Sequence, residues 1–175
     1  MPVGRRARVP NRGSTALPAE VHAPILGSRV VDWPDEAACT RFAAQLALQP
    51  ALRDAFVELH GPLGAGKTTF VRHLLRALGV TGRIKSPTYA VVEPYALQGL
   101  AISHFDFYRF DDPREWADAG FRDAFAAPGL KLAEWPERAA GMLPVADLQL
   151  FIEPLEHDTR HVRIVAATAR GLALL

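Results

Sequence analysis

The stretch GPLGAGKT, residues 61–68, decides the fold class of this chain. It matches the pattern G-x-x-x-x-G-K-[S/T] without a mismatch, and at this length and composition a chance match is roughly a one-in-a-thousand event. The apolar run AFVELH at 55–60 precedes it and predicts a buried strand. Apolar side chains at helical spacing follow over 70–78. Strand, glycine-rich loop and helix in this order predict a phosphate-binding loop, or P-loop.

The residue types in the loop suit a triphosphate. Small residues at Gly64, Ala65 and Gly66 let successive backbone N–H groups point at phosphate oxygens, where the next helix presents its positive end. Lys67 is expected to bridge the β- and γ-phosphates. The Thr68 hydroxyl is expected to be a Mg²⁺ ligand, and Thr69 to donate to a phosphate nearer the base.

Hydrolysis also needs a carboxylate that positions the metal. Asp106 ends the apolar run at 100–106, and Glu134 ends the run at 130–134. Ligands of α/β sheets collect at the carboxyl ends of the strands, so one of the two acids is expected to serve the metal. The residue pattern alone leaves open which one.

Three further polar residues have two interpretations each. Ser86 and Thr88 follow the P-loop helix, where nucleotide switches carry sensors of the γ-phosphate, but an ordinary turn explains them equally well. His104 shares a strand face with Asp106 and could orient that carboxylate. A packed, hydrogen-bonded histidine is the favoured interpretation of His104.

The rest of the chain predicts an α/β fold. The order of elements favours a P-loop NTPase-like three-layer sandwich with a mixed, partly antiparallel sheet. The expected elements are a helix over 34–49 with Pro34 in its first turn, an antiparallel hairpin of 89–95 and 100–107, a helix over 112–125 broken near Gly120, and strands at 129–135, 147–153 and 161–168.

Length and composition favour one folded domain. The chain has 175 residues, of which 49% are hydrophobic and 22% charged, enough to bury a sizeable core. Residues 1–19 contain four arginines and no acid, so 1–25 are expected to be a disordered basic extension. Residues 26–170 are expected to form the P-loop domain and 171–175 a C-terminal tail. No apolar run is long enough to span a membrane, so a cytoplasmic protein is expected.

Charge and cysteine content exclude some functions. Twenty basic and 19 acidic side chains give a net charge of +1, which is no argument for direct nucleic-acid binding by the whole domain. Cys39 is the single cysteine, so neither a disulfide framework nor a thiolate metal cluster is expected.

Four motifs in register then point to a family. They are GAGKTTF at 64–70, KSPTY with VEPY at 85–95, HFDFYR at 104–109 and EWPER at 134–138. From about residue 26 to 169 the chain resembles the TsaE (YjeE) family, the bacterial ATPases of tRNA threonylcarbamoyladenosine synthesis.

The resemblance implies roles for individual residues. It implies ATP and Mg²⁺ as ligands, with the phosphates held by residues 64–69. By position, Thr68 and Glu134 would hold Mg²⁺, and Asp106 would be the acid needed for ATPase activity. Ser86 and Thr88 would form the switch segment, and Trp135 would lie beside the site. Glu36 and Arg160 would contact the nucleotide near its base.

The resemblance also implies partners. The ATPase would turn over slowly alone and act with TsaB and TsaD, which place a threonylcarbamoyl group on N6 of the adenosine beside the anticodon. It would meet tRNA only through that complex, in agreement with the near-neutral charge. Two alternatives remain: a small-molecule P-loop kinase, for which residues around Arg109, Arg114 and Arg122 could supply a lid, and a non-enzymatic nucleotide-gated scaffold.

Overall fold

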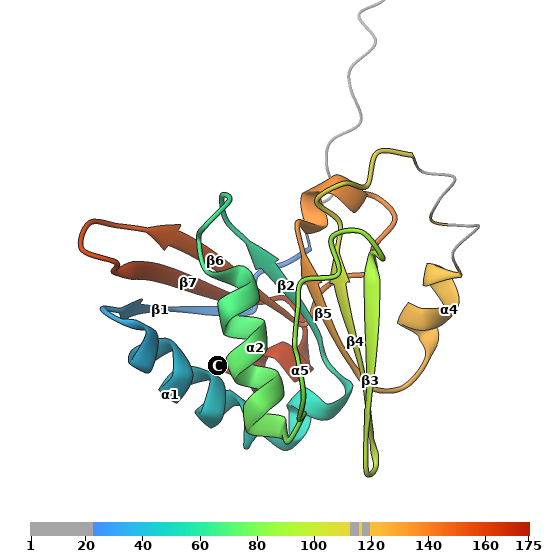
Figure 1. The fold of residues 1–175 in the computed structure, drawn as a ribbon, viewed down its shortest axis with the longest axis horizontal. Coiled ribbons are helices and arrows are strands. Elements are labelled where there is room, and N and C mark those ends of the chain that lie inside the picture. The colour runs from blue at the N-terminus through green and yellow to red at the C-terminus, as the bar shows by residue number, and fades with distance from the viewer. Residues whose placement is uncertain (1–22, 113–115, 117–119) are drawn as a thin grey trace, which may run out of the picture.

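The computed structural model describes residues 23–112, 116 and 120–175, which form one seven-stranded sheet with helices on both faces (Figure 1). Residues 1–22, which make up most of the predicted basic extension, lie outside the described part. Within that part, no helix has both the length and the apolar character needed to span a membrane.

The sheet is mixed, as predicted. Its strands are β1 (Gly27–Trp33), β2 (Phe56–His60), β3 (Val92–Leu97), β4 (Leu100–Asp106), β5 (Leu130–Glu134), β6 (Leu148–Pro154) and β7 (Arg160–Ala166). They lie in the order β1-β7-β6-β2-β5-β4-β3. The central strands β6, β2, β5 and β4 are parallel, while β1, β7 and β3 add antiparallel pairs at the two sides. The carboxyl ends of the parallel strands therefore share one edge.

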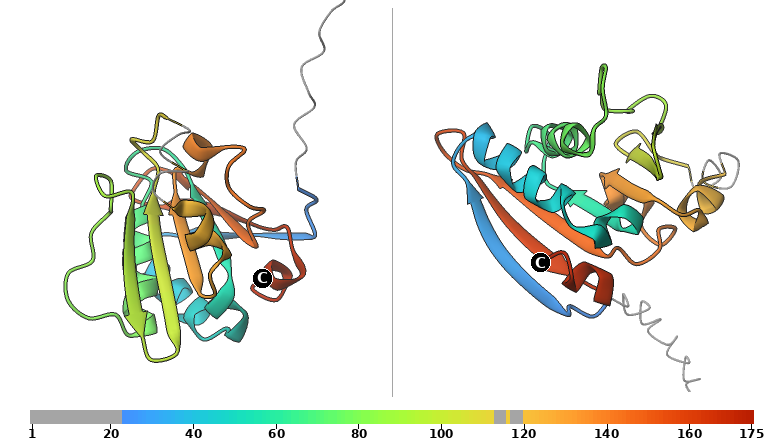
Figure 2. Two further views of the ribbon diagram at one scale, coloured as in Figure 1. Left: turned by 90° about the vertical axis from the view of Figure 1, so that its right-hand side faces the viewer. Right: turned by 90° about the horizontal axis from the view of Figure 1, so that it is seen from below.

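Helices cover both faces of this sheet. They are α1 (Glu36–Ala47), α2 (Lys67–Leu78), α4 (Phe121–Ala126) and α5 (Ala169–Leu172), with the 3₁₀ helices η1 (Pro50–Asp54) and η2 (Pro136–Ala139). Helices α1 and α2 pack side by side on one face, and α4 packs on the other (Figure 2). These are the three layers expected from the sequence.

Each face has its own core. The α1–α2 face buries Phe70 and Leu74 of α2 with Leu59 and Leu132 of the central strands. The opposite face is aromatic: the Phe105 ring is stacked on that of Phe125 of α4, with 4.6 Å between ring centroids. Because β2 and β5 are buried on both faces, the strand ends that border the P-loop have a rigid base.

The bounds of several elements differ from prediction: β3, for example, spans Val92–Leu97 and not 89–95, and both long helices begin elsewhere. Helix α1 begins after Pro34, because the Asp35 carboxylate accepts a hydrogen bond from Ala38 N at 2.7 Å and caps the helix. Helix α2 begins at Lys67, three residues earlier than the apolar spacing indicates. The apolar pattern marks only the buried face, so it misses the first polar turn of this helix.

Strand β1 is absent from the sequence-based prediction. It lies at the edge of the sheet and, within the described part of the chain, pairs with β7 alone. Among its residues only Trp33 is buried, and Arg29 and Asp32 are exposed. An edge strand with so little buried surface lacks the apolar alternation that identifies strands.

The last residues are not the predicted tail. Gly171 belongs to α5, and Leu174 is 4% exposed and packs in the α1–α2 core. A Cβ at Gly171 would lie 1.7 Å from the carbonyl oxygen of Asp147, so only glycine permits this approach to the start of β6. Thr168 caps the short helix by accepting from Gly171 N.

The helix predicted over 112–125 is observed in part. Its last portion corresponds to α4. This helix begins after Gly120, whose backbone is in the left-handed conformation. Residues 113–115 and 117–119 lie outside the described part of the chain, as does the Arg114 of the candidate lid.

Candidate functional site

The P-loop runs from β2 to α2 at the carboxyl edge of the parallel strands (Figure 1). Gly61 has φ +142°, and a Cβ there would lie 2.4 Å from the carbonyl oxygen of Ile152. The loop can leave β2 beside β6 only because this residue has no side chain. Gly66, in a left-handed conformation, then turns the chain into α2, so the first N–H groups of the helix face the loop.

A cavity of about 370 Å³ opens above this loop. It brings together nearly all the residues singled out from the sequence. Its lining consists of Leu63, Gly64, Ala65, Gly66, Lys67, Thr68, Thr69, Ser86, Thr88, Asp106, Tyr108, Glu134 and Trp135. Segments far apart in the sequence, from α2, the loop before β3 and the ends of β4 and β5, therefore meet at one place.

The Lys67 side chain is folded back onto its own loop and is only 4% exposed. Its Nζ donates to the carbonyl oxygens of Gly61 at 2.5 Å and Pro62 at 2.9 Å, and lies 3.8 Å from the centroid of the Trp135 ring. Burial lowers the pKa of Lys67, and the nearby carboxylates, Glu134 foremost, oppose that shift. Two of the three N–H groups of the ammonium are thus engaged by carbonyl oxygens of the loop itself.

Glu134 is joined to the P-loop helix directly. The Thr68 hydroxyl lies 3.0 Å from Oε1 and 2.8 Å from Oε2 of Glu134, whose side chain is almost entirely buried. His104 Nε2 lies 2.8 Å from the same Oε1. His104 is thus a packed, hydrogen-bonded histidine, as favoured from the sequence, but the carboxylate it contacts is Glu134 and not Asp106.

Asp106 is held by a separate set of donors. Ser86 Oγ and Thr88 Oγ1 both donate to its Oδ2, Thr88 at 2.9 Å, and the backbone N–H of Tyr108 donates to Oδ1 at 2.9 Å. The segment with Ser86 and Thr88 is therefore more than a turn, because both hydroxyls bind a carboxylate in the cavity. Sequence reasoning gave Tyr108 no role, although it stands two residues after Asp106.

Trp135 follows Glu134 in a strained conformation. Its φ is +57°, which is uncommon for a bulky residue. The centroid of its ring lies 5.0 Å from the centroid of the Tyr108 ring, and the Lys67 ammonium packs against the same ring. The turn after β5 therefore places an aromatic wall beside the P-loop lysine.

Glu36 and Arg160 line a second cavity, of about 540 Å³, on the other side of the loop. Ala65, Gly66 and Thr69 line both cavities. Arg160 Nε donates to the Ala65 carbonyl oxygen at 2.9 Å, and Glu36 pairs with His73 of α2 at 2.9 Å.

Cys39 also lines the second cavity, and sequence reasoning gave it only a packing role. Burial raises the pKa of its thiol to about 12. The thiol is therefore protonated and unreactive at neutral pH.

The donors in the first cavity suit a hard cation. Thr68 and Glu134 offer hydroxyl and carboxylate oxygens, the ligand type that Mg²⁺ prefers, and Asp106 stands opposite Glu134 in the β4–β5 pairing. Among the residues described, no three or more His, Cys, Asp and Glu side chains cluster as a metal site.

Known proteins are similar to this chain in sequence. Residues 33–162 match the family model "Threonylcarbamoyl adenosine biosynthesis protein TsaE". The chain is 42% identical over 142 residues to the tRNA threonylcarbamoyladenosine biosynthesis protein TsaE of Haemophilus influenzae, covering 79% of this chain and 89% of that protein. It is 34% identical over 131 residues to the Bacillus subtilis protein of the same name, covering 75% and 82%.

A solved structure is similar over most of the fold. The crystal structure of YdiB from Bacillus subtilis superposes with a TM-score of 0.67 at 25% identity and covers 85% of this chain and 91% of that one. A glycine-rich loop between a parallel strand and a helix, facing two carboxylates at neighbouring strand ends, defines a P-loop NTPase-like α/β protein. Within that class, the chain belongs to the TsaE family, as the four motifs indicate.

Proposed function

We propose that this protein binds ATP with Mg²⁺ and hydrolyses it as a component of tRNA threonylcarbamoyladenosine formation, acting in the cytoplasm with TsaB and TsaD. The observation that carries the proposal is the cavity in which Lys67 and Thr68 face two carboxylates held by different donors. The names of the relatives supply the pathway.

The proposal assigns separate roles to the loop, the two carboxylates and the two hydroxyls of the segment before β3. The backbone N–H groups of 64–69 and the Lys67 ammonium bind the phosphates. Thr68 and Glu134 hold Mg²⁺, which when bound offsets the negative charge of the β- and γ-phosphates. Asp106 orients the attacking water. Ser86 and Thr88 sense the γ-phosphate, because a movement of their hydroxyl groups releases the Asp106 carboxylate to which they donate.

The nucleoside is proposed to lie in the second cavity. It adjoins the first through the three loop residues that line both, so a nucleotide can pass its phosphates to one side and its base to the other. Glu36 and Arg160 would meet the base or ribose there, and Trp135 would stay beside the phosphates.

Glu134→Ala is expected to weaken ATP binding in Mg²⁺ by about tenfold or more and to change binding in EDTA by less than about twofold. The reason is that the lost carboxylate contacts the metal and not the phosphates. Equilibrium binding of a fluorescent ATP analogue measures the affinity in Mg²⁺ and the affinity in EDTA. Glu153→Ala, an exposed acid on β6 outside the cavity, is the matched control. Equal losses in both conditions would transfer the metal role to Asp106.

Multiple-turnover reconstitution of tRNA modification tests the function itself. TsaB, TsaD, tRNA and the threonylcarbamoyl donor are combined with and without this protein, and modified tRNA and released phosphate are followed together. We expect modification beyond the first round to require this protein and its phosphate release to rise with the partners. No effect on either would sink the proposal.

The small-molecule kinase remains the alternative. Of the candidate lid arginines, Arg109 is exposed, with its guanidinium 4.4 Å from the centroid of the Tyr89 ring at the surface. Incubation with γ-labelled ATP and a metabolite extract separates the two functions. Label transferred to a small acceptor would favour the kinase, and label recovered only as inorganic phosphate would favour the ATPase.

A further inference from the structure

His104 is a buried polar residue with no role in the scheme above. It lies on β4, is fully buried, and faces the same side of the sheet as Asp106. In the β4–β5 pairing Asp106 stands opposite Glu134, while His104 stands opposite Leu132. His104 is therefore the diagonal neighbour of Glu134, within reach of its carboxylate.

The hydrogen bond between the two side chains fixes the position of the imidazole proton. An ionised carboxylate only accepts hydrogen bonds, so Nε2, 2.8 Å from Glu134 Oε1, must carry a hydrogen. The other ring nitrogen, Nδ1, is buried and has no hydrogen-bond partner among the described residues. The Nε2 contact with Glu134 is therefore the one hydrogen bond of this imidazole among the described residues.

The two acids at the strand ends need separate supports. Neighbouring like charges repel across a strand pair. Asp106 is held by Ser86, Thr88 and the Tyr108 backbone, whereas Glu134 is held by Thr68 and His104. Of the two side-chain donors to Glu134, Thr68 would itself be a metal ligand and His104 would not, so the His104 bond can hold the carboxylate with or without the metal.

We propose that His104 is a positioning residue that keeps the Glu134 carboxylate aimed at Thr68 through its Nε2–H bond, and so raises the affinity of the nucleotide site for Mg²⁺. This inference rests on the proposed function of the site. Donors behind a metal ligand restrict its orientation, and their loss commonly costs 10- to 100-fold in metal affinity.

Three variants separate the hydrogen bond from packing. His104→Leu keeps an apolar volume in the core but has no donor. His104→Gln places an amide nitrogen near the position of Nε2. His104→Asn places its amide nitrogen near the position of Nδ1, because the asparagine side chain is too short to reach Glu134. Asn is therefore the polar control for Gln. Thermal unfolding of each variant shows that it is folded before binding is measured.

The measurement is ATP-analogue binding over a range of Mg²⁺ concentrations, and again in EDTA. With His104→Leu and His104→Asn, we expect the Mg²⁺ concentration that gives half of the maximal gain in ATP-analogue affinity to rise by about tenfold. Affinity in EDTA should stay within about twofold of the wild-type value. His104→Gln should recover most of the wild-type Mg²⁺ response. In a Glu134→Ala background, His104→Leu should change nothing further.

The outcomes distinguish this inference from the proposed function. If the wild type binds the analogue equally well with and without Mg²⁺, the metal role of the site fails and this inference with it. If the wild type responds to Mg²⁺ and folded His104→Leu responds identically, the proposed function stands and the inference is overturned. Equal weakening of binding in Mg²⁺ and in EDTA would assign His104 to packing alone and overturn it as well.

Discussion

Lys67→Ala is expected to lower ATP affinity by about 100-fold or more, because several charge-assisted hydrogen bonds to the phosphates are lost together. Among the residues that the structure describes, Lys67 is the single lysine lining the cavity. ATP-dependent stimulation of tRNA modification should be lost with it. The measurements are equilibrium binding of an ATP analogue and phosphate release in the reconstituted system.

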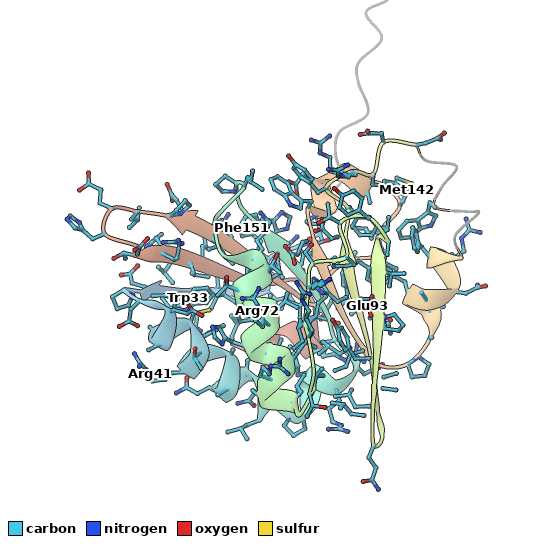
Figure 3. The ribbon with its side chains drawn as sticks, in the orientation of Figure 1. Trp33, Arg41, Arg72, Glu93, Met142 and Phe151 are labelled. Atoms are coloured by element: carbon cyan, nitrogen blue, oxygen red, sulfur yellow. The ribbon has the colours of Figure 1, made fainter. Side chains whose placement is uncertain are left out.

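Arg72→Ala is the matched control for Lys67→Ala. Arg72 lies on the same helix, α2, but on its exposed side and outside both cavities (Figure 3). The Arg72→Ala variant should bind and hydrolyse ATP like the wild type. Because Lys67 also donates to the Gly61 and Pro62 carbonyls, thermal unfolding of Lys67→Ala is compared first. A folded Lys67→Ala with unaltered affinity and turnover would refute the P-loop assignment.

Asp106→Asn is expected to lower ATP turnover by about 100- to 1,000-fold while ATP affinity changes by less than about threefold. The amide keeps the shape of the carboxylate but cannot accept the proton or orient the water as an anion does. The Asp106 carboxylate accepts hydrogen bonds from Ser86, Thr88 and the Tyr108 backbone, whereas Thr68 and Glu134 are bonded to each other. Phosphate release at saturating ATP, measured with TsaB and TsaD present, checks the turnover.

The same variant decides between an enzyme and a nucleotide-gated scaffold. A scaffold would support repeated tRNA modification after Asp106→Asn, since binding alone would be sufficient. An ATPase would not. Asp111→Asn, an exposed acid five residues further along the chain, is the control and should behave like the wild type.

Much of the site could be predicted because its parts are local in sequence. The loop at 61–68 presents its backbone N–H groups in succession, so one continuous segment specifies the proposed phosphate cradle. Asp106 and Glu134 could be placed beside it because each ends a strand of a parallel sheet. The buried face of α2 was visible for the same reason, in the spacing of its apolar residues.

Other features could not be predicted, because they depend on which side chains meet after packing. The contact of His104 with Glu134, and not with its strand neighbour Asp106, follows from the register of β4 against β5. Strand β1 depends on pairing with β7, more than one hundred residues away in the sequence.

The sequence by itself determined the class of protein, the P-loop and the two carboxylates at the strand ends, since each is specified by neighbouring residues. The tertiary structure alone decided how the acids divide their partners, with Glu134 bound to Thr68 and His104, and Asp106 bound to Ser86 and Thr88. It also decided the inward fold of Lys67 beneath Trp135. The physical reason is that a hydrogen bond or ring contact between distant segments depends on strand register and helix packing, which no single segment encodes.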